Sequence, residues 1–195
     1  MEGSDEELMQ RYSAGEPGAF DTLYARHRTA LYRYLLRQSR DAAVTDDLFQ
    51  ETWSRVISSR ERYQPTARFR TYLFHLAHNC FIDHYRRRKA RPEVGAEPGL
   101  EERIAADEGS DPAQRVEAAV MRRRYLRALE SLPAEQRDTF LLYEEAGLSL
   151  DDIGGVMGVA AETAKSRLRY AVAKLKKALA SGAGKAPLYL VEQPE

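Results

Sequence analysis

The chain has 195 residues, of which 43% are hydrophobic, so it can build one medium-sized domain or two small ones. Basic and acidic residues number 30 each, and this zero net charge gives no support for nucleic-acid binding by the chain as a whole. Its one cysteine, Cys80, excludes an intramolecular disulfide, and no apolar run reaches the roughly 18 to 20 residues of a membrane span. The acidic start lacks the pattern of a secretory signal, so we expect a reducing, cytoplasmic location.

Helical periodicity dominates the sequence and predicts an all-α fold, because no sustained period-2 run marks a strand. Apolar residues at helical spacing predict a first helix over residues 20–35 and a second over 46–57, with Thr45 as its N-cap. A third helix is marked by apolar residues between positions 69 and 80. We expect these helices to form an N-terminal domain over residues 1–91.

The composition changes after this domain. Residues 93–117 carry eight acids and two bases among scattered Gly and Pro, which is typical of a flexible acidic linker, assigned to 92–117. A second small helical domain is expected over 118–180, and a tail over 181–195. The predicted architecture is two small helical domains joined by this linker.

The second domain contains the pattern of a helix-turn-helix. Ser149 and Asp152 fit a capping box that starts a helix at Leu150, and Gly158 can take the left-handed conformation that ends it. The following helix carries six bases and one acid between Glu162 and Lys177. Because the second helix of such a motif enters the major groove, this pattern favours DNA binding, although a solvated helical hairpin would have the same pattern.

A second basic cluster lies at the end of the third predicted helix, where His84 and Tyr85 precede Arg86, Arg87, Arg88 and Lys89. Aromatic residues stand among arginines just upstream, a mixture that binds unstacked bases. Phe69 and Phe81 are better explained as core residues, whereas Tyr72 and Tyr85 fit either role.

The 46–57 helix shows a polar rim beside large apolar residues. That arrangement is typical of a protein-docking surface with Phe49 and Trp53 as anchors, but a core tryptophan under a solvated acidic face fits equally well. No glycine-rich phosphate loop, GxSxG sequence or paired-cysteine zinc motif is present, so we expect no catalytic residue, metal or cofactor. His75, His78 and Cys80 are close in sequence, but their spacing does not put them on one helix face.

The order of these segments resembles the extracytoplasmic-function (ECF) class of bacterial sigma factors from Ala19 to Leu179. Four stretches carry the resemblance, at residues 19–37, 46–57, 68–88 and 128–179. The resemblance implies an alternative-type, non-enzymatic factor that joins core RNA polymerase at the β′ clamp and β flap and directs promoter-specific initiation. It also implies promoter DNA and an anti-sigma protein as partners.

The resemblance assigns roles to matching positions. Docking on polymerase is implied for Asp47, Gln50, Glu51 and Trp53. Binding and melting of the −10 element are implied for Arg68, Tyr72, His78, Asn79, Asp83, Arg86 and Arg87, with the loop at 63–68 capturing an extruded base. Reading of the −35 element is implied for Glu162, Thr163, Lys165, Ser166, Arg167 and Arg169.

Two features depart from the family pattern. Gly154 and Gly155 lie inside the first helix of the helix-turn-helix, where each costs up to about 1 kcal/mol relative to Ala. The reading helix starts Glu162-Thr163-Ala164, so its −35 sequence cannot be predicted. Two other functions stay open: a stand-alone, dimeric helix-turn-helix regulator, and a metal-dependent sensor or enzyme built on His75, His78 and Cys80.

Overall fold

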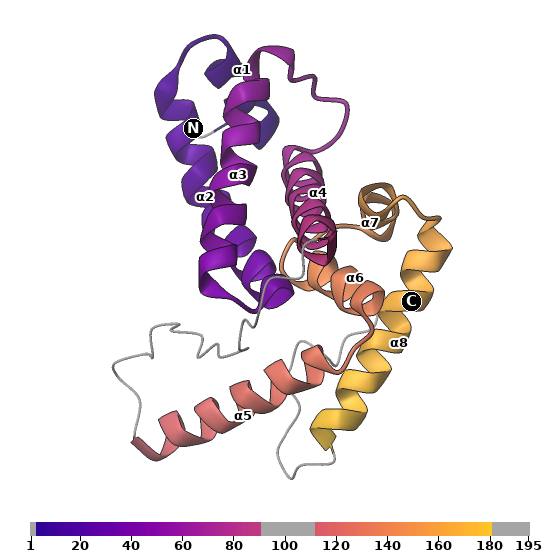
Figure 1. Cartoon of the computed structure of the whole chain (residues 1–195). Coiled ribbons are helices and arrows are strands. Elements are labelled where there is room, and N and C mark those ends of the chain that lie inside the picture. Colours follow the sequence, from indigo (N-terminus) through magenta and orange to yellow (C-terminus); the bar gives the residue numbers. More distant parts are fainter. Residues whose placement is uncertain (1–2, 91–111, 181–195) are drawn as a thin grey trace.

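The computed structural model describes residues 3–90 and 112–180, and these segments fold into eight α-helices without a strand (Figure 1). The all-α prediction is therefore confirmed for this part of the chain. The acidic segment at 92–111 and the tail at 181–195 lie outside the described residues. The helices are α1 (Asp5–Ser13), α2 (Pro17–Ser39), α3 (Ala42–Ser59), α4 (Phe69–Ala90), α5 (Pro112–Glu130), α6 (Ala134–Glu144), α7 (Leu150–Met157) and α8 (Ala161–Ala180).

The N-terminal unit contains α1 to α4, with α1 as a helix that the sequence analysis did not predict. A capping box starts it: the Ser4 side chain accepts from the Glu7 backbone N–H, and Glu7 accepts from the Ser4 N–H. Leu8 and Met9 are buried on its inner face. This helix closes one end of the domain.

The predicted N-cap of α3 was wrong by four residues. Asp41 is the N-cap, and its carboxylate accepts from the Val44 N–H at 3.1 Å. Thr45 lies inside the helix, fully buried, and its hydroxyl donates to the Asp41 carbonyl. A threonine in a first turn can satisfy its hydroxyl in this way as readily as it can cap, so the side-chain type alone did not fix the boundary.

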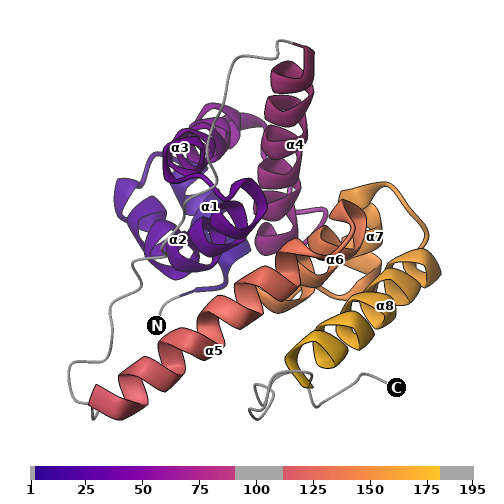
Figure 2. The same ribbon diagram turned by 60° about the horizontal axis from the view of Figure 1, so that its bottom comes forward.

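The C-terminal unit begins earlier than predicted. Helix α5 starts at Pro112, whereas the linker was expected to continue to residue 117. Proline suits the first turn of a helix because its missing N–H has no acceptor there, so here it starts a helix rather than marking a linker. Figure 2 shows α5 extending away from the rest of the unit, with α6, α7 and α8 gathered beyond its C-terminal end.

The predicted start and end of α7 are confirmed. Ser149 is its N-cap and accepts from the Asp152 N–H at 3.2 Å, while Gly158 ends the helix at φ 66°. The buried stripe of α8 comprises Ala164, Leu168, Ala171, Leu175 and Leu179, and Val172 is partly buried. Helices α7 and α8 thus form the expected helix-turn-helix.

The two glycines of α7 should respond oppositely to alanine. A Cβ on Gly154 would lie 2.8 Å from the Val159 carbonyl oxygen, whereas a Cβ on Gly155 would meet nothing within 4 Å. Gly154→Ala should therefore destabilise the fold by about 1–3 kcal/mol, and Gly155→Ala should stabilise it by up to about 1 kcal/mol. Urea denaturation of both variants measures this, and equal effects would contradict the close approach at Gly154.

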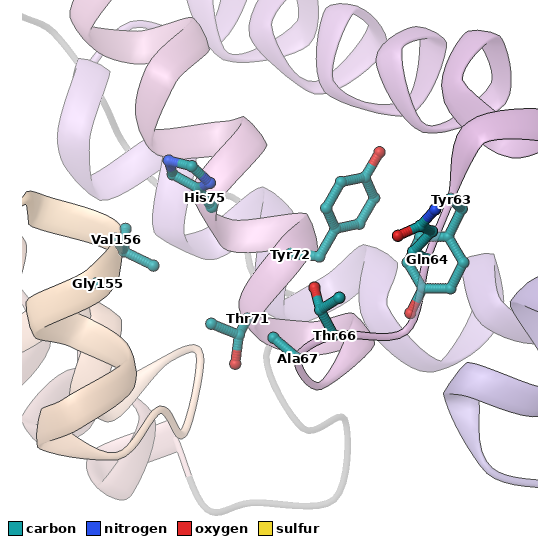
Figure 3. A pocket seen from close by; sticks show the side chains of 9 residues that line it. All are labelled: Tyr63, Gln64, Thr66, Ala67, Thr71, Tyr72, His75, Gly155 and Val156. Carbon is teal, nitrogen blue, oxygen red and sulfur yellow. The ribbon is translucent and has the colours of Figure 1, made fainter.

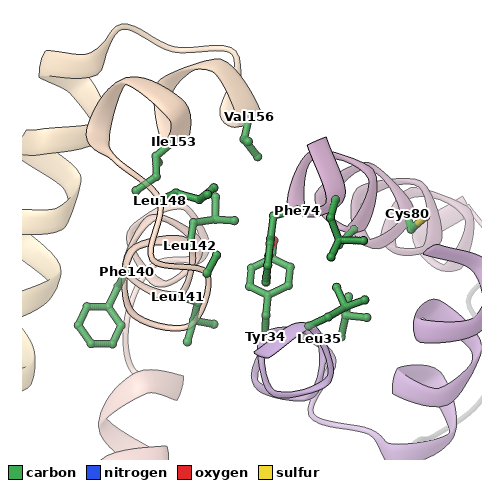
Figure 4. Packing of buried hydrophobic residues seen from close by; sticks show 14 of the residues in the cluster. Tyr34, Leu35, Phe74, Cys80, Phe140, Leu141, Leu142, Leu148, Ile153 and Val156 are labelled. Carbon is green, nitrogen blue, oxygen red and sulfur yellow. The ribbon is translucent and has the colours of Figure 1, made fainter. Parts of the chain in front are cut away.

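The two units share one hydrophobic core. Tyr34 of α2 and Phe74 of α4 face Leu141 and Leu142 of α6, as Figure 4 shows, and all four are buried. The domains predicted from sequence are thus in direct contact here. Among the helices of residues 3–90 and 112–180, none has both the length and the apolar composition of a membrane span.

Candidate nucleic-acid and docking interfaces

The expected docking residues of α3 divide into surface and core. Asp47 and Gln50 are exposed, and Glu51 is half-buried and pairs with Arg55 at 2.5 Å. Trp53 is only 4% exposed, because its ring packs against Phe20 and Tyr24 with centroids 5.6 and 5.1 Å away. Trp53 is therefore a core tryptophan in this structure and supports the surface from beneath, while its role in docking stays a prediction.

A groove of about 340 Å³ joins this surface to the end of α4, lined by Glu51, Arg55, Asp83, Arg86 and Arg87. Arg55 lies 3.8 Å from the Asp83 carboxylate, and Arg87 lies 3.7 Å from that of Glu51. Asp83, Arg86 and Arg87 are all exposed. The structure therefore places predicted docking and −10 residues side by side, with arginines available to phosphate oxygens.

A second cavity, of about 180 Å³, lies under the loop between α3 and α4 (Figure 3). From the N-terminal unit it is lined by Tyr63, Gln64, Thr66, Ala67, Thr71, Tyr72 and His75, and from α7 by Gly155 and Val156. Burial, followed by nearby Glu6, raises the pKa of Tyr63 to about 12, so its hydroxyl stays protonated. The cavity offers aromatic walls and polar side chains, which suit a planar polar ligand.

Tyr72 and Tyr85, which fitted either a core role or a base-binding role, differ in exposure. The Tyr72 ring is half-buried, packs edge-on against Tyr63 at 5.3 Å, and its hydroxyl hydrogen-bonds that of Ser59 at 2.5 Å. Tyr85 is 60% exposed and stacks on Phe81. Tyr85, which the site prediction omitted, is thus more accessible than Tyr72, which lines the cavity. Arg68, just before α4, is exposed as well.

His78 and Asn79 are less accessible than predicted. Asn79 is half-buried, and the His78 side chain is 12% exposed with Nδ1 2.9 Å from the Asp138 carboxylate of α6. His78 therefore does not face open solvent in this arrangement. Cys80 is fully buried, and within the described segments no three metal-ligating side chains gather, so the geometry offers no support for a metal-dependent sensor.

Helix α1 holds the start of α4, where the loop over the second cavity ends. The Glu6 carboxylate accepts from the backbone N–H of Phe69, the first residue of α4, at 2.7 Å. Asp5 lies 2.6 Å from the buried His27 ring, which packs against Phe69. Sequence reasoning missed this support, although the capping sequence that begins at Ser4 was a usable signal.

This support should make stability depend on pH. Burial lowers the pKa of His27 despite the nearby Asp5 carboxylate, and burial lowers that of His75 as well. The unfolded chain then binds protons first as pH falls through about 6.5. The stability that these two neutral histidines contribute is therefore present above that pH and is lost below it. Urea denaturation at about pH 7.5 and about pH 5.5 should show this loss, and His27→Gln should reduce it. An unchanged pH dependence in His27→Gln would refute the assignment.

Most of the residues expected to read the −35 element lie on the exposed face of α8. Glu162, Thr163, Lys165 and Arg169 are exposed, and Ser166 is half-buried. Arg167 is held against Glu135 of α6 at 2.9 Å, which directs it away from the centre of this face. Arg169 lies over the ring of Tyr170, a 53% exposed residue that the site prediction did not include. A basic face on the second helix of a helix-turn-helix suits the major groove.

Comparisons with known families cover both units. The family described as Sigma-70 region 2 matches residues 23–91, and that described as Sigma-70, region 4 matches residues 122–175. Helix α1 and the start of α2 precede the first match.

Individual relatives extend over nearly the whole chain. It is 33% identical over 176 residues to RNA polymerase sigma factor CarQ of Myxococcus xanthus, covering 88% of this chain and 95% of CarQ. It is 36% identical over 167 residues to ECF RNA polymerase sigma factor SigL of Mycobacterium tuberculosis, covering 84% and 90%.

Two solved structures share the fold. The sigma factor RpoE in complex with the anti-sigma factor NepR from Bartonella quintana aligns with a TM-score of 0.67 and 23% identity, covering 84% of this chain and 98% of that chain. CnrH in complex with the cytosolic domain of CnrY aligns with a TM-score of 0.65 and 23% identity, covering 93% and 100%.

Proposed function

The chain belongs to the ECF RNA polymerase sigma factors, and we propose that its surfaces divide promoter recognition between the two units. As an alternative sigma factor it acts in transcription initiation. Asp47, Gln50 and Glu51 dock on core polymerase, and α8 reads the −35 element. The observation that carries the proposal is the exposed first half of α8, with Lys165 and Arg169 on one face of a capped helix-turn-helix.

The N-terminal unit melts the −10 element in this proposal. Extruding a base costs a few kcal/mol of stacking and pairing, so a cavity must return that free energy. The cavity at Tyr63, Gln64 and Tyr72 offers stacking and hydrogen bonds to the base. Arg86 and Arg87, exposed at the end of α4, neutralise phosphates of the melted strand.

We also propose that a partner protein binds and inhibits this chain. The titles of the two aligned structures name CnrY and the anti-sigma factor NepR as partners of those proteins. By the same architecture we propose that an anti-sigma protein binds this chain. We further propose that the chain acts in the cytoplasm, where core polymerase is found, and that it catalyses no reaction of its own.

Co-purification with bacterial core RNA polymerase tests the function. The tagged chain should bind core polymerase and start run-off transcripts at discrete sites on genomic fragments. A chain that ignores polymerase yet binds a palindromic duplex as a dimer would establish the stand-alone regulator instead.

Charge reversal on the docking surface should weaken assembly. Asp47 is exposed on α3, so Asp47→Lys should leave the fold intact and lower affinity for core polymerase at least about fivefold. Asp21→Lys, at an exposed acid of α2, is the matched control and should bind normally. Equal affinity of the two variants, measured by fluorescence anisotropy, would remove Asp47 from the interface.

A further inference from the structure

Helix α1 lies outside the family match, yet it contacts the start of α4. The Sigma-70 region 2 match begins at residue 23, whereas α1 ends at Ser13. The Glu6 carboxylate of α1 accepts from the backbone N–H of Phe69 at 2.7 Å, across 63 positions of the sequence. The first N–H groups of a helix have no acceptor inside the helix, so Glu6 supplies one from another element. Its negative charge also suits the positive end of the α4 dipole.

Helix α1 is anchored at the residues that surround Glu6. The Asp5 carboxylate lies 2.8 Å from the Arg26 guanidinium of α2 and 2.6 Å from the buried His27 ring. Arg26 also donates to the Gly3 carbonyl at 3.0 Å. Glu6 itself is half-buried. Its carboxylate is therefore presented to α4 by a fixed helix rather than by a free chain end.

The bond to Phe69 lies where the loop over the second cavity ends. Residues 64–68 of this loop are exposed, so the position of the loop depends on its two ends. At the first end, the Tyr63 ring packs against Phe69 and Tyr72, with centroids 6.3 and 5.3 Å away. At the other end, Glu6 holds the Phe69 N–H. Phe69 thus takes part in both ends, and the Glu6 bond fixes its backbone.

Tyr63, which lines the second cavity, has an unused hydrogen-bonding group. Among the described residues its buried hydroxyl has no hydrogen-bond partner. Burial and then the charge of Glu6 raise the pKa of this hydroxyl to about 12, so it stays a donor. A buried polar group without a partner is costly, so a ligand that pairs with it gains binding free energy. Figure 3 shows Tyr63 beside Gln64 and Thr66, two further polar residues of the cavity.

These contacts connect the N-terminal helix to the cavity. We propose that Glu6 is a positioning residue for base capture: by binding the Phe69 N–H it fixes the 63–68 loop, and with it Tyr63, where an extruded base stacks. This role rests on the proposed melting of the −10 element by the N-terminal unit. A stacking wall binds best when it is in place before the base arrives, because ordering it on binding costs free energy. Loss of the Glu6 carboxylate should therefore weaken base capture more than assembly with polymerase.

Forked DNA tests this role in the complex of the chain with core polymerase. The forks contain a start site found by run-off transcription and a single-stranded −10 element, and each fork of a series lacks one base. The ratio of the affinities for the intact fork and for the weakest abasic fork measures base capture. Unfolded protein lowers both affinities equally, so a loss of stability alone does not change the ratio. The wild type should prefer the intact fork at least about tenfold.

Three substitutions in α1 separate the hydrogen bond from other effects. Glu6→Ala removes the acceptor and should lower the affinity ratio at least about threefold. Glu6→Gln keeps a carbonyl oxygen for the Phe69 N–H and should retain most of the ratio. Glu7→Ala is the matched control, because Glu7 is exposed and its carboxylate accepts from the Ser4 N–H rather than from α4. The control should leave the ratio unchanged.

Hydrogen exchange in the free, full-length chain provides an independent readout. The Phe69 amide should exchange slowly in the wild type and in Glu6→Gln, and at least about tenfold faster in Glu6→Ala. A wild-type Phe69 amide that exchanges as fast as an unprotected amide would overturn the bond, whether or not any variant folds.

The affinity ratios decide the role of the bond. An unchanged ratio in Glu6→Ala, or an equal loss in Glu7→Ala, would overturn the positioning role. A ratio in Glu6→Gln as low as that in Glu6→Ala would overturn the hydrogen bond as its cause. A wild type that joins polymerase but shows no preference for the intact fork would instead overturn the proposed base capture, and the positioning role with it, while the Phe69 exchange rate still tests the bond.

Discussion

Trp53→Ala is expected to lower the free energy of unfolding by about 3–5 kcal/mol. Its ring is 4% exposed among Phe20, Tyr24 and Phe49, so alanine would leave a cavity in the N-terminal core. The variant should lose polymerase binding only in proportion to its unfolded fraction. Urea denaturation and polymerase binding at the same temperature measure both effects.

The contrast with surface variants makes this result specific. Trp53→Phe keeps an aromatic ring and should cost much less, whereas Asp47→Lys should lose binding without losing stability. A Trp53→Ala protein that keeps its stability but no longer binds polymerase would show that the indole contacts the partner directly. The arrangement of the aromatic cluster would then have to differ in the complex.

Local signals in the sequence predicted local structure well. Ser149 and Gly158 set the ends of α7 as expected, because capping and left-handed turns depend on a few adjacent residues. The same signals were ambiguous where two polar residues competed, as Asp41 and Thr45 did at the start of α3. Helix α1 was missed although Ser4 and Glu7 form a capping box, since its nine residues bury only Leu8 and Met9.

Contacts between helices were harder to predict than the helices themselves. Periodicity shows which face of one helix is apolar, but not which helix it meets, so Trp53 could not be assigned to core or surface. Asp138 lies in the polar first half of α6 and gave no signal of burial, because its partners Tyr34 and Gln38 lie about a hundred positions away. The family resemblance implied that His78 faces DNA, and its contact with Asp138, far away in the sequence, could not be predicted.

Exposure along α4 was predicted only in part. The basic cluster at its C-terminal end is exposed as expected, because like charges avoid burial. Tyr72 and Tyr85 share residue type and neighbouring arginines, yet only Tyr85 is largely exposed. The difference arises from the 63–68 loop, which packs Tyr63 against Tyr72 and could not be placed from sequence.

Arg169→Ala is expected to reduce binding to the chain's own −35 element by about 5- to 150-fold, the equivalent of about 1–3 kcal/mol for a base contact. Arg169 is exposed on the same face of α8 as Lys165, and the Tyr170 ring beside it limits its freedom before binding. The probe is a duplex that the polymerase complex selects from a random pool. Fluorescence anisotropy at fixed salt measures the affinity of each variant for this duplex and for random duplexes. Lys174→Ala, also exposed but five residues further along α8 and so on another face, should weaken all duplexes slightly and equally. If Arg169→Ala also weakens selected and random duplexes by the same factor, Arg169 binds phosphate, and the sequence reading must be assigned to Glu162, Thr163 and Lys165.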